Sequence, residues 1–219
     1  MDKKLVLVGG GGHCKSVIDS LSEKSEYSEI VITDYSLPEG TIVNGCNVVG
    51  NDDCLPDLKN NGFDYAFITM GSVGKPNVRA SLVEEIEKLG FLSPIIIDST
   101  AVIADDVHIG QGTFIGKNAT INTGVSIGSH CIINTGCIIE HESVIGDKCH
   151  IATGAILCGG VHVGNNSFVG AGSTIIQSVC IGKNVVIGAN STVLYNIGDE
   201  MKVCGILSKN SGGGPKLSN

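Results

Sequence analysis

Residues 115 to 138 consist of four consecutive hexads, IGKNAT, INTGVS, IGSHCI and INTGCI. The same six-residue period continues without an insertion from residue 97 to residue 192, which makes sixteen hexads. Their first position is always Ile, Leu or Val, and their fifth is always Ala, Val, Thr, Ser or Cys. A branched and a small side chain fill the interior of a coil together, while Gly and Asn at positions two to four allow positive φ in tight turns. The period therefore predicts a parallel β-helix.

The sequence before the repeat has a different pattern, in which short apolar runs alternate with amphipathic segments. Strands are expected at residues 5–8, 30–33, 65–69 and 95–98, and helices at residues 17–24 and 78–90. Alternating strands and helices indicate a small parallel sheet. In the second helix, the apolar face at helical spacing consists of Val78, Leu82, Ile86 and Leu89.

The change of pattern predicts how the chain is divided. The expected parts are a Rossmann-like α/β domain at residues 1–94, a β-helix domain at 95–196, and a C-terminal cap with a flexible tail at 197–219.

Composition argues against several kinds of partner. The net charge of -8 speaks against nucleic acid, because duplex binding depends on cationic side chains that meet phosphates. There is no apolar run of about 18 residues and no basic, apolar leader, so we expect no membrane span and a cytoplasmic protein. The nine cysteines form no CxxC pair, and we expect reduced, mostly buried thiols.

Four segments together carry a resemblance to a known family. They are LVLVGGGGHCKSVIDSL from residue 5, VITDY from residue 31, FITMGSVGKPNVR from residue 67 and IIEHESVIGDKCHIATGA from residue 138. With the repeat, they resemble the hexapeptide nucleotide-sugar acetyltransferases of the bacillosamine and perosamine type, to which sialic acid O-acetyltransferases are related. The resemblance implies a left-handed β-helix with three hexads per coil, and a homotrimer.

One turn of the repeat is unusually charged, with Glu140, His141 and Glu142 in succession. Acyl transfer to an amine or hydroxyl requires a base, and imidazole exchanges protons near neutral pH. The resemblance assigns His141 as the general base and Glu142 as the group that raises its basicity, and it leaves Glu140 without a role. With three hexads per coil, His141 should stack on Gly159, where we expect open space for a substrate.

The resemblance also implies acetyl-CoA as cosubstrate, bound in a groove between subunits. It assigns His150 to contact with acetyl-CoA and, through the matching turns of the repeat, Ala171 and Ala189 as further contacts. Asn134 is expected near the acceptor sugar. No resident metal is expected.

A glycine-rich loop, VGGGGHCKS, follows the first expected strand and opens the first helix, where free N–H groups and the helix dipole favour phosphate. Gly9 and Gly11 fit GxG, but Cys14 stands where a dinucleotide fingerprint has its third glycine. A mononucleotide moiety such as UDP is therefore favoured. The resemblance carries substrate binding to Gly11, Gly12, His13, Asp34 and Gly50.

The expected function is an acetyl-CoA-dependent N-acetyltransferase acting on the amino group of a UDP-linked amino sugar. One alternative is O-acetylation of sialic acid or another sugar hydroxyl, which would use the same catalytic residues. Another class is a zinc lyase of the carbonic anhydrase type, which uses the same β-helix with histidines that bind zinc between subunits. His130, His141 and His150 are available as ligands here. That reading leaves Glu142 and the glycine-rich loop unexplained.

Overall fold

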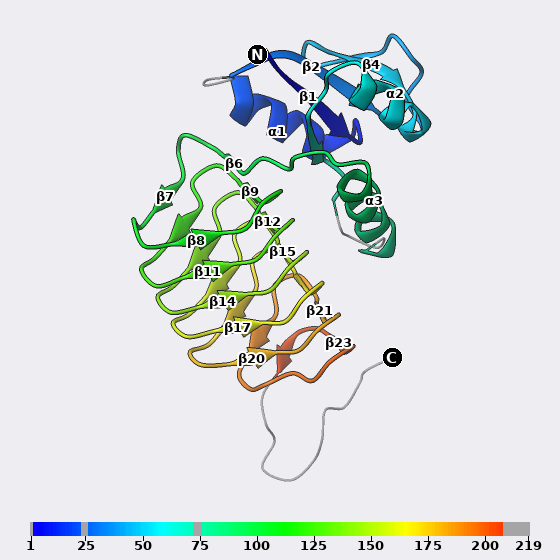
Figure 1. The fold of residues 1–219 in the computed structure, drawn as a ribbon. Helices are drawn as coiled ribbons and strands as arrows, with labels where there is room; N and C mark the ends of the chain where they lie inside the picture. Colours follow the sequence, from blue (N-terminus) through cyan, green and yellow to red (C-terminus); the bar gives the residue numbers. More distant parts are fainter. Residues whose placement is uncertain (1, 23–25, 72–75, 208–219) are drawn as a thin grey trace. The chain divides into compact units, whose positions relative to one another are not determined.

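The computed structural model describes residues 2–22, 26–71 and 76–207. The chain forms two compact units, Met1–Ser99 and Thr100–Asn219 (Figure 1). Each unit has a hydrophobic core of its own.

The N-terminal unit is built on a five-stranded sheet with the strand order β3-β4-β2-β1-β5. Its apolar run at residues 5–8 is fully buried in the centre, because β1 has parallel neighbours on both sides. This confirms the Rossmann-like α/β unit. Its elements are β1 (Lys3–Val8), α1 (Gly12–Ser22), β2 (Tyr27–Thr33), β3 (Ile42–Val43), β4 (Cys46–Gly50), η1 (Asp52–Cys54), α2 (Leu55–Asn60), β5 (Tyr65–Ile68), α3 (Pro76–Lys88) and β6 (Ile96–Ile97).

The sequence interpretation missed the antiparallel hairpin of β3 and β4. Its turn is Asn44-Gly45, and both residues have positive φ, at 44° and 87°. An Asn-Gly pair between short strands is a strong hairpin signal, so this element was predictable. The expected strand at 95–98 appears as β6, but it is not part of the five-stranded sheet.

Helix α3 faces the core differently from the prediction. Leu82 and Ile86 are buried as expected, whereas Val78 is 46% exposed. The buried position in the first turn is instead Arg79, whose side chain donates from Nε to the Met70 carbonyl at 3.2 Å. The prediction for Val78 was wrong because a buried hydrogen-bonding arginine occupies the adjacent position on the helix.

The C-terminal unit contains a two-residue strand every six residues, from β7 to β22, which confirms the hexad register. The strands are β7 (Val102–Ile103), β8 (His108–Ile109), β9 (Phe114–Ile115), β10 (Thr120–Ile121), β11 (Ser126–Ile127), β12 (Ile132–Ile133), β13 (Ile138–Ile139), β14 (Val144–Ile145), β15 (His150–Ile151), β16 (Ile156–Leu157), β17 (His162–Val163), β18 (Phe168–Val169), β19 (Thr174–Ile175), β20 (Cys180–Ile181), β21 (Val186–Ile187) and β22 (Thr192–Val193). They stack into three parallel sheets (Figure 1). Residues eighteen apart are paired, as Ile138 is with Ile156, so one coil contains three hexads.

The interior of the coil is filled by the first and fifth hexad positions, as predicted. Cys131, Cys137 and Cys149 occupy the fifth position and are fully buried. Their thiols lie 3.0 to 3.2 Å from carbonyl oxygens one coil further on. All nine cysteines are free thiols, but Cys180 and Cys204 are exposed, so the expectation of burial holds for only part of the set.

Positive φ is confined to the fourth hexad position in the described turns of the repeat. Gly and Asn provide most of these residues, but Glu142 adopts the same conformation with φ of 57°. After Val193 the spacing becomes irregular, yet β23 (Lys202–Val203) and β24 (Ile206–Leu207) still pair with β21 and β22. Residues assigned to the cap thus continue the coil.

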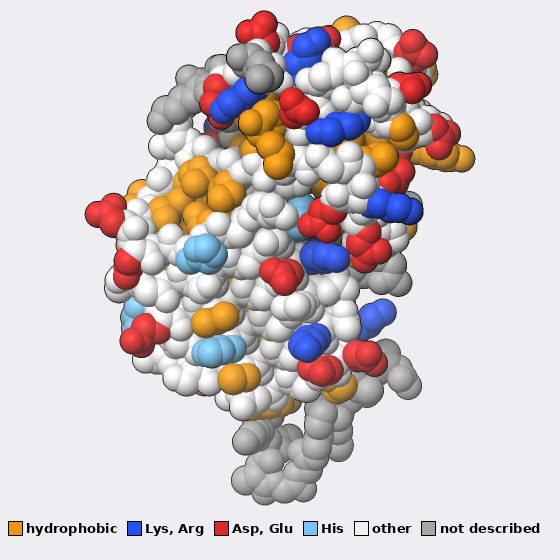
Figure 2. Space-filling view, in the orientation of Figure 1, with side chains coloured by type: hydrophobic (Ala, Val, Ile, Leu, Met, Phe, Trp, Pro, Cys, Tyr) orange, Lys and Arg blue, Asp and Glu red, His pale blue; other side chains and the backbone are white. Residues whose placement is uncertain are grey.

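In the sheet formed by β8, β11, β14, β17 and β20, the first residue of each two-residue strand lies on the outer face. Four of these residues are exposed and Ser126 is half-buried. Histidine and apolar side chains both lie over this sheet in Figure 2. Within the described parts of the chain, no helix has the length and apolar character needed to cross a bilayer.

Candidate active site

The charged turn Glu140-His141-Glu142 joins β13 to β14 at one corner of the coil. Hydrogen bonds to the coils on both sides hold its backbone. The Glu142 N–H donates to the Thr123 carbonyl at 3.1 Å, and the His141 carbonyl accepts from the Gly160 N–H at 2.8 Å. The side chains project outward, with 52% of His141 and 79% of Glu142 exposed. The repeat therefore supplies a rigid backbone under two accessible functional groups.

His141 and Glu142 face each other, with 3.5 Å between Nδ1 and Oε2. This is longer than an ideal N–H···O hydrogen bond, but the carboxylate lies on the Nδ1 side of the ring. A carboxylate at Nδ1 favours the tautomer in which Nε2 is the basic atom. The pair that the sequence predicted is therefore brought together.

The space beside Gly159 is occupied, which corrects the expectation of an open approach. A Cβ on Gly159 would lie 2.5 Å from both Cε1 and Nε2 of His141. The imidazole itself folds onto this glycine and fills the space that a substrate was expected to use.

Glu140 has a partner that sequence reasoning missed. The Asn122 side-chain amide donates to Oε2 of Glu140 at 3.0 Å, and the Asn122 Oδ1 accepts from the Thr123 N–H at 2.8 Å. The Asp106 carboxylate in turn accepts from the Thr123 hydroxyl at 2.8 Å. The eighteen-residue spacing between Asn122 and Glu140 was the signal available in the sequence.

His150 and Asn134 also lie together. His150 is only 6% exposed and packs edge-to-face on Phe168, with ring centroids 5.1 Å apart. The Asn134 Nδ2 is 3.4 Å from His150 Nε2. Asn134 thus lies beside the predicted acetyl-CoA residue and at a different corner from His141.

Ala171 and Ala189 occupy equivalent turns in successive coils, and the Ala171 carbonyl accepts from the Asn190 N–H at 2.8 Å. Both are exposed. Their turns, like that of Asn134, join the sheet of β12 and β18 to the sheet of β13 and β19. The His141 corner lies at the other edge of that second sheet.

The glycine-rich loop lies where β1, β2 and β4 end, so the predicted substrate residues gather at one edge of the sheet. The Gly9 N–H donates to the Thr33 carbonyl, and the Asp34 N–H donates to the Gly50 carbonyl, at 2.8 and 2.9 Å. Gly11 and Gly12 are exposed, and no atom of residues 2–22, 26–71 or 76–207 outside the adjoining backbone lies within 4 Å of a Cβ at either position. Ligands of open parallel sheets bind at this edge.

Asp34 ties the loops of this edge together. Oδ2 accepts from the Gly10 N–H at 2.7 Å, and Oδ1 accepts from the Ser36 and Leu37 N–H groups at 2.7 and 2.9 Å. Partial burial opposes the charge, but these three donors outweigh it and lower the pKa of Asp34. The carboxylate therefore organises the loop.

His13 is neutral in this site. Burial, and secondarily the positive charge of Arg79, lower the pKa of His13 to about 4. A neutral imidazole at the start of α1 carries one donor and one acceptor nitrogen rather than a positive charge.

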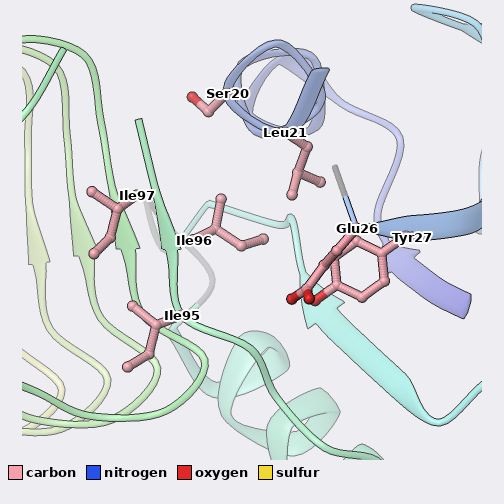
Figure 3. Close-up of a pocket in the computed structure, with 7 residues that line it drawn as sticks. All are labelled: Ser20, Leu21, Glu26, Tyr27, Ile95, Ile96 and Ile97. Atoms are coloured by element: carbon pink, nitrogen blue, oxygen red, sulfur yellow. The ribbon is translucent and has the colours of Figure 1, made fainter. Parts of the chain in front are cut away.

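A separate pocket of about 150 Å³ lies at the other end of α1 (Figure 3). Ser20, Glu26 and Tyr27 provide its polar groups, and Ile95, Ile96 and Ile97 line one side. None of the predicted substrate residues lines this pocket.

The proposed zinc ligands do not meet within the chain. His130 is buried in its own turn, His141 lies at a different corner, and His150 packs on Phe168. Over residues 2–22, 26–71 and 76–207, no group of three or more His, Cys, Asp or Glu side chains is arranged to hold a metal ion.

The uninterrupted hexads, three per coil, with functional side chains projecting from the turns, define the class of hexapeptide-repeat β-helix proteins. Two family models match the chain. Residues 4–86 match the PglD N-terminal domain, and residues 106–141, 142–177 and 160–194 match the bacterial transferase hexapeptide (six repeats). A comparison of the sequence with curated proteins gives no match.

Several solved structures resemble this chain over nearly its whole length. A variant of perosamine N-acetyltransferase from Caulobacter crescentus, in complex with CoA and GDP-perosamine, is 32% identical over 92% of this chain and 93% of that chain, with a TM-score of 0.86. The acetyltransferase domain of PglB from Neisseria gonorrhoeae, in complex with acetyl coenzyme A, is 30% identical over 94% and 97%, with a TM-score of 0.85. WeeI from Acinetobacter baumannii is 25% identical over 93% and 97%, with a TM-score of 0.79.

The chain belongs to the hexapeptide-repeat sugar acetyltransferase family. Its β-helix is accordingly of the left-handed kind, as the resemblance implied.

Proposed function

We propose that this protein transfers the acetyl group of acetyl-CoA to the amino group of a nucleotide-linked amino sugar, with UDP as the carrier predicted from the sequence. The observation that carries the proposal is the His141-Glu142 pair, held 3.5 Å apart in a rigid turn of a sugar acetyltransferase fold. The related perosamine N-acetyltransferase is in complex with CoA and GDP-perosamine, which supports a nucleotide amino sugar as acceptor class.

In the proposed reaction, the neutral amine attacks the thioester carbonyl carbon while Nε2 of His141 accepts a proton from the nitrogen. The Glu142 carboxylate stabilises the imidazolium that forms. The C–S bond then breaks, and His141 returns the proton to the departing CoA thiolate. The acetyl group passes directly to the amine, without an acyl-enzyme.

We assign nucleotide-sugar binding to residues 1–94 and acetyl transfer to residues 95–196. Gly11 and Gly12 leave room for phosphates at the N-terminus of α1, which favours anions. His13 would bind as a neutral donor or acceptor, and Asp34 and Gly50 would shape the same edge of the sheet.

We assign acetyl-CoA to the corner that carries Ala171, Ala189 and Asn134, next to His150. This corner and the His141 corner lie at opposite edges of one sheet. A homotrimer in which one copy presents its His141 corner to the acetyl-CoA corner of the next would bring the two sets together. The free thiols fit a reducing compartment such as the cytoplasm.

An acceptor panel tests the proposal. The purified protein is given acetyl-CoA with a UDP-linked amino sugar, GDP-perosamine or sialic acid, and both CoA release and product mass are measured. Acetylation of a nucleotide amino sugar is expected, and the two nucleotide substrates identify the carrier. Acetylation of sialic acid alone would refute N-acetylation. Stoichiometric zinc with CO₂ hydration would indicate the lyase instead.

A further inference from the structure

The two glycines that follow Cys158 differ in what they do for the structure. Gly160 has φ of +67°, a conformation that favours glycine, and the nearest atom to a Cβ there is Ser178 Oγ at 3.5 Å. Gly159 is not among the residues with positive φ. Its backbone would therefore accept another residue, and the reason for glycine at this position lies elsewhere.

The imidazole of His141 provides that reason. A Cβ on Gly159 would lie 2.5 Å from Cε1 and Nε2 of His141 and 3.1 Å from Cδ2. Non-bonded carbon atoms attract one another best at about 3.5 to 4.0 Å, so these distances are repulsive. The ring therefore occupies its position only because residue 159 has no side chain.

We propose that Gly159 is a positioning residue that sets the orientation of the catalytic imidazole. The Gly160 N–H donates to the His141 carbonyl and so holds the backbone of His141 in place. The imidazole ring packs onto Gly159, and its Nδ1 atom faces Glu142. A methyl group at residue 159 would turn the ring away from this carboxylate. The inference rests on the proposed function for its effect on rate, but its effect on the ring is independent of that function.

The kinetic test compares Gly159→Ala with Gly198→Ala. Gly198 is exposed and also lacks positive φ, and no atom of the described residues lies within 4 Å of a Cβ there, so the control makes the same change without a clash. Gly159→Ala is expected to lower kcat by about 10- to 100-fold, because small displacements of a reacting group are costly. The KM values should stay within about threefold, since the assigned binding residues are unchanged. The control should retain wild-type kcat.

A second measurement follows the ring directly. Histidine-selective isotope labelling, with His141→Ala for assignment, gives the NMR signal of His141 in the intact protein. The signal should move in Gly159→Ala and stay in Gly198→Ala. Because the ring is half exposed and free to rotate outward, the Tm of Gly159→Ala should remain close to wild type.

The possible outcomes distinguish the positioning role of Gly159 from the proposed role of His141 as the base. A moved signal with reduced kcat supports the inference. An unmoved signal overturns it, whether or not kcat falls, because the alanine would then act elsewhere. A moved signal with full kcat shows that Gly159 positions the ring and refutes His141 as the base.

Discussion

Asn122 and Glu140 occupy the same place in successive coils, and the Asn122 amide donates a 3.0 Å hydrogen bond to the Glu140 carboxylate. The two acids that flank His141 therefore have different partners. Glu140 is held by the preceding coil, whereas Glu142 faces Nδ1 of the imidazole. This difference distinguishes the two acids by their contacts.

Glu142→Gln should lower kcat by about 10- to 100-fold, since the carboxylate that stabilises the imidazolium is lost. Glu140→Gln should keep kcat within about threefold, because Glu140 contacts Asn122 rather than the ring. Steady-state rates with saturating substrates measure both. Equal losses in the two variants would contradict the assignment of Glu142.

Glu142→Gly distinguishes the role of the Glu142 carboxylate in activity from the role of residue 142 in the stability of the turn. Glu142 has φ of 57°, which glycine adopts without strain, so the substitution should leave stability unchanged or raise it by about 1 kcal/mol. Activity should fall as it does in Glu142→Gln. A lower Tm in this variant would show that the side chain holds the turn, and thermal unfolding beside an activity assay decides the point.

Gly112→Ala should destabilise the β-helix more than Gly136→Ala. Both glycines have positive φ, at 66° and 67°, but a Cβ on Gly112 would overlap the buried ring of His130. Among the residues that the structure describes, no atom lies within 4 Å of a Cβ on Gly136, so this variant carries only the backbone strain of about 1 kcal/mol. The extra loss at Gly112 should be about 1 to 3 kcal/mol. Similar denaturation midpoints for the two variants would show that the His130 ring can move aside without a loss of stability.

Stability should depend on His13 between about pH 6.5 and pH 4. Burial lowers the pKa of His13 to about 4 in the folded state, below its ordinary value in the unfolded chain. The unfolded chain therefore binds more protons in this window, and the contribution present above it is lost as the pH falls. The loss should reach about 2 to 3 kcal/mol in the wild type.

His13→Gln removes that contribution. Denaturant unfolding at pH 7 and pH 5 should show a smaller loss for the variant than for the wild type. Asp34 also titrates, but it is present in both proteins, so the difference between them isolates His13. The same pH dependence in both would mean that His13 is charged in the folded protein.

Asp34→Asn should weaken nucleotide-sugar binding and leave the acetyl-transfer step unchanged. An amide has only one acceptor oxygen for the three N–H groups that Asp34 receives, so the glycine-rich loop loses at least one hydrogen bond. The KM for the nucleotide sugar should rise by about tenfold with kcat retained. A fall in kcat alone would place Asp34 in the chemistry instead.

Much of the β-helix was determined by the sequence, because every hexad has a branched side chain at its first position and a small one at its fifth, and both face the interior. This pattern predicts which residues face inward, and Cys131, Cys137 and Cys149, all at the fifth position, are buried as it predicts. The same register put Glu140, His141 and Glu142 on the outside. The length of one coil came from the resemblance, since a six-residue period does not by itself state how many hexads close a turn.

Only the tertiary structure decided how the outer side chains meet. His141 folds onto Gly159, Asn122 binds Glu140, and Asn134 lies beside His150, in each case across a step between coils. The hexad pattern constrains the volume of the interior side chains but not the rotamers of the exposed ones. Contacts with the neighbouring coil decide those rotamers. The expected open space at Gly159 was wrong for this reason: a position without a side chain in one coil accommodates the ring of another.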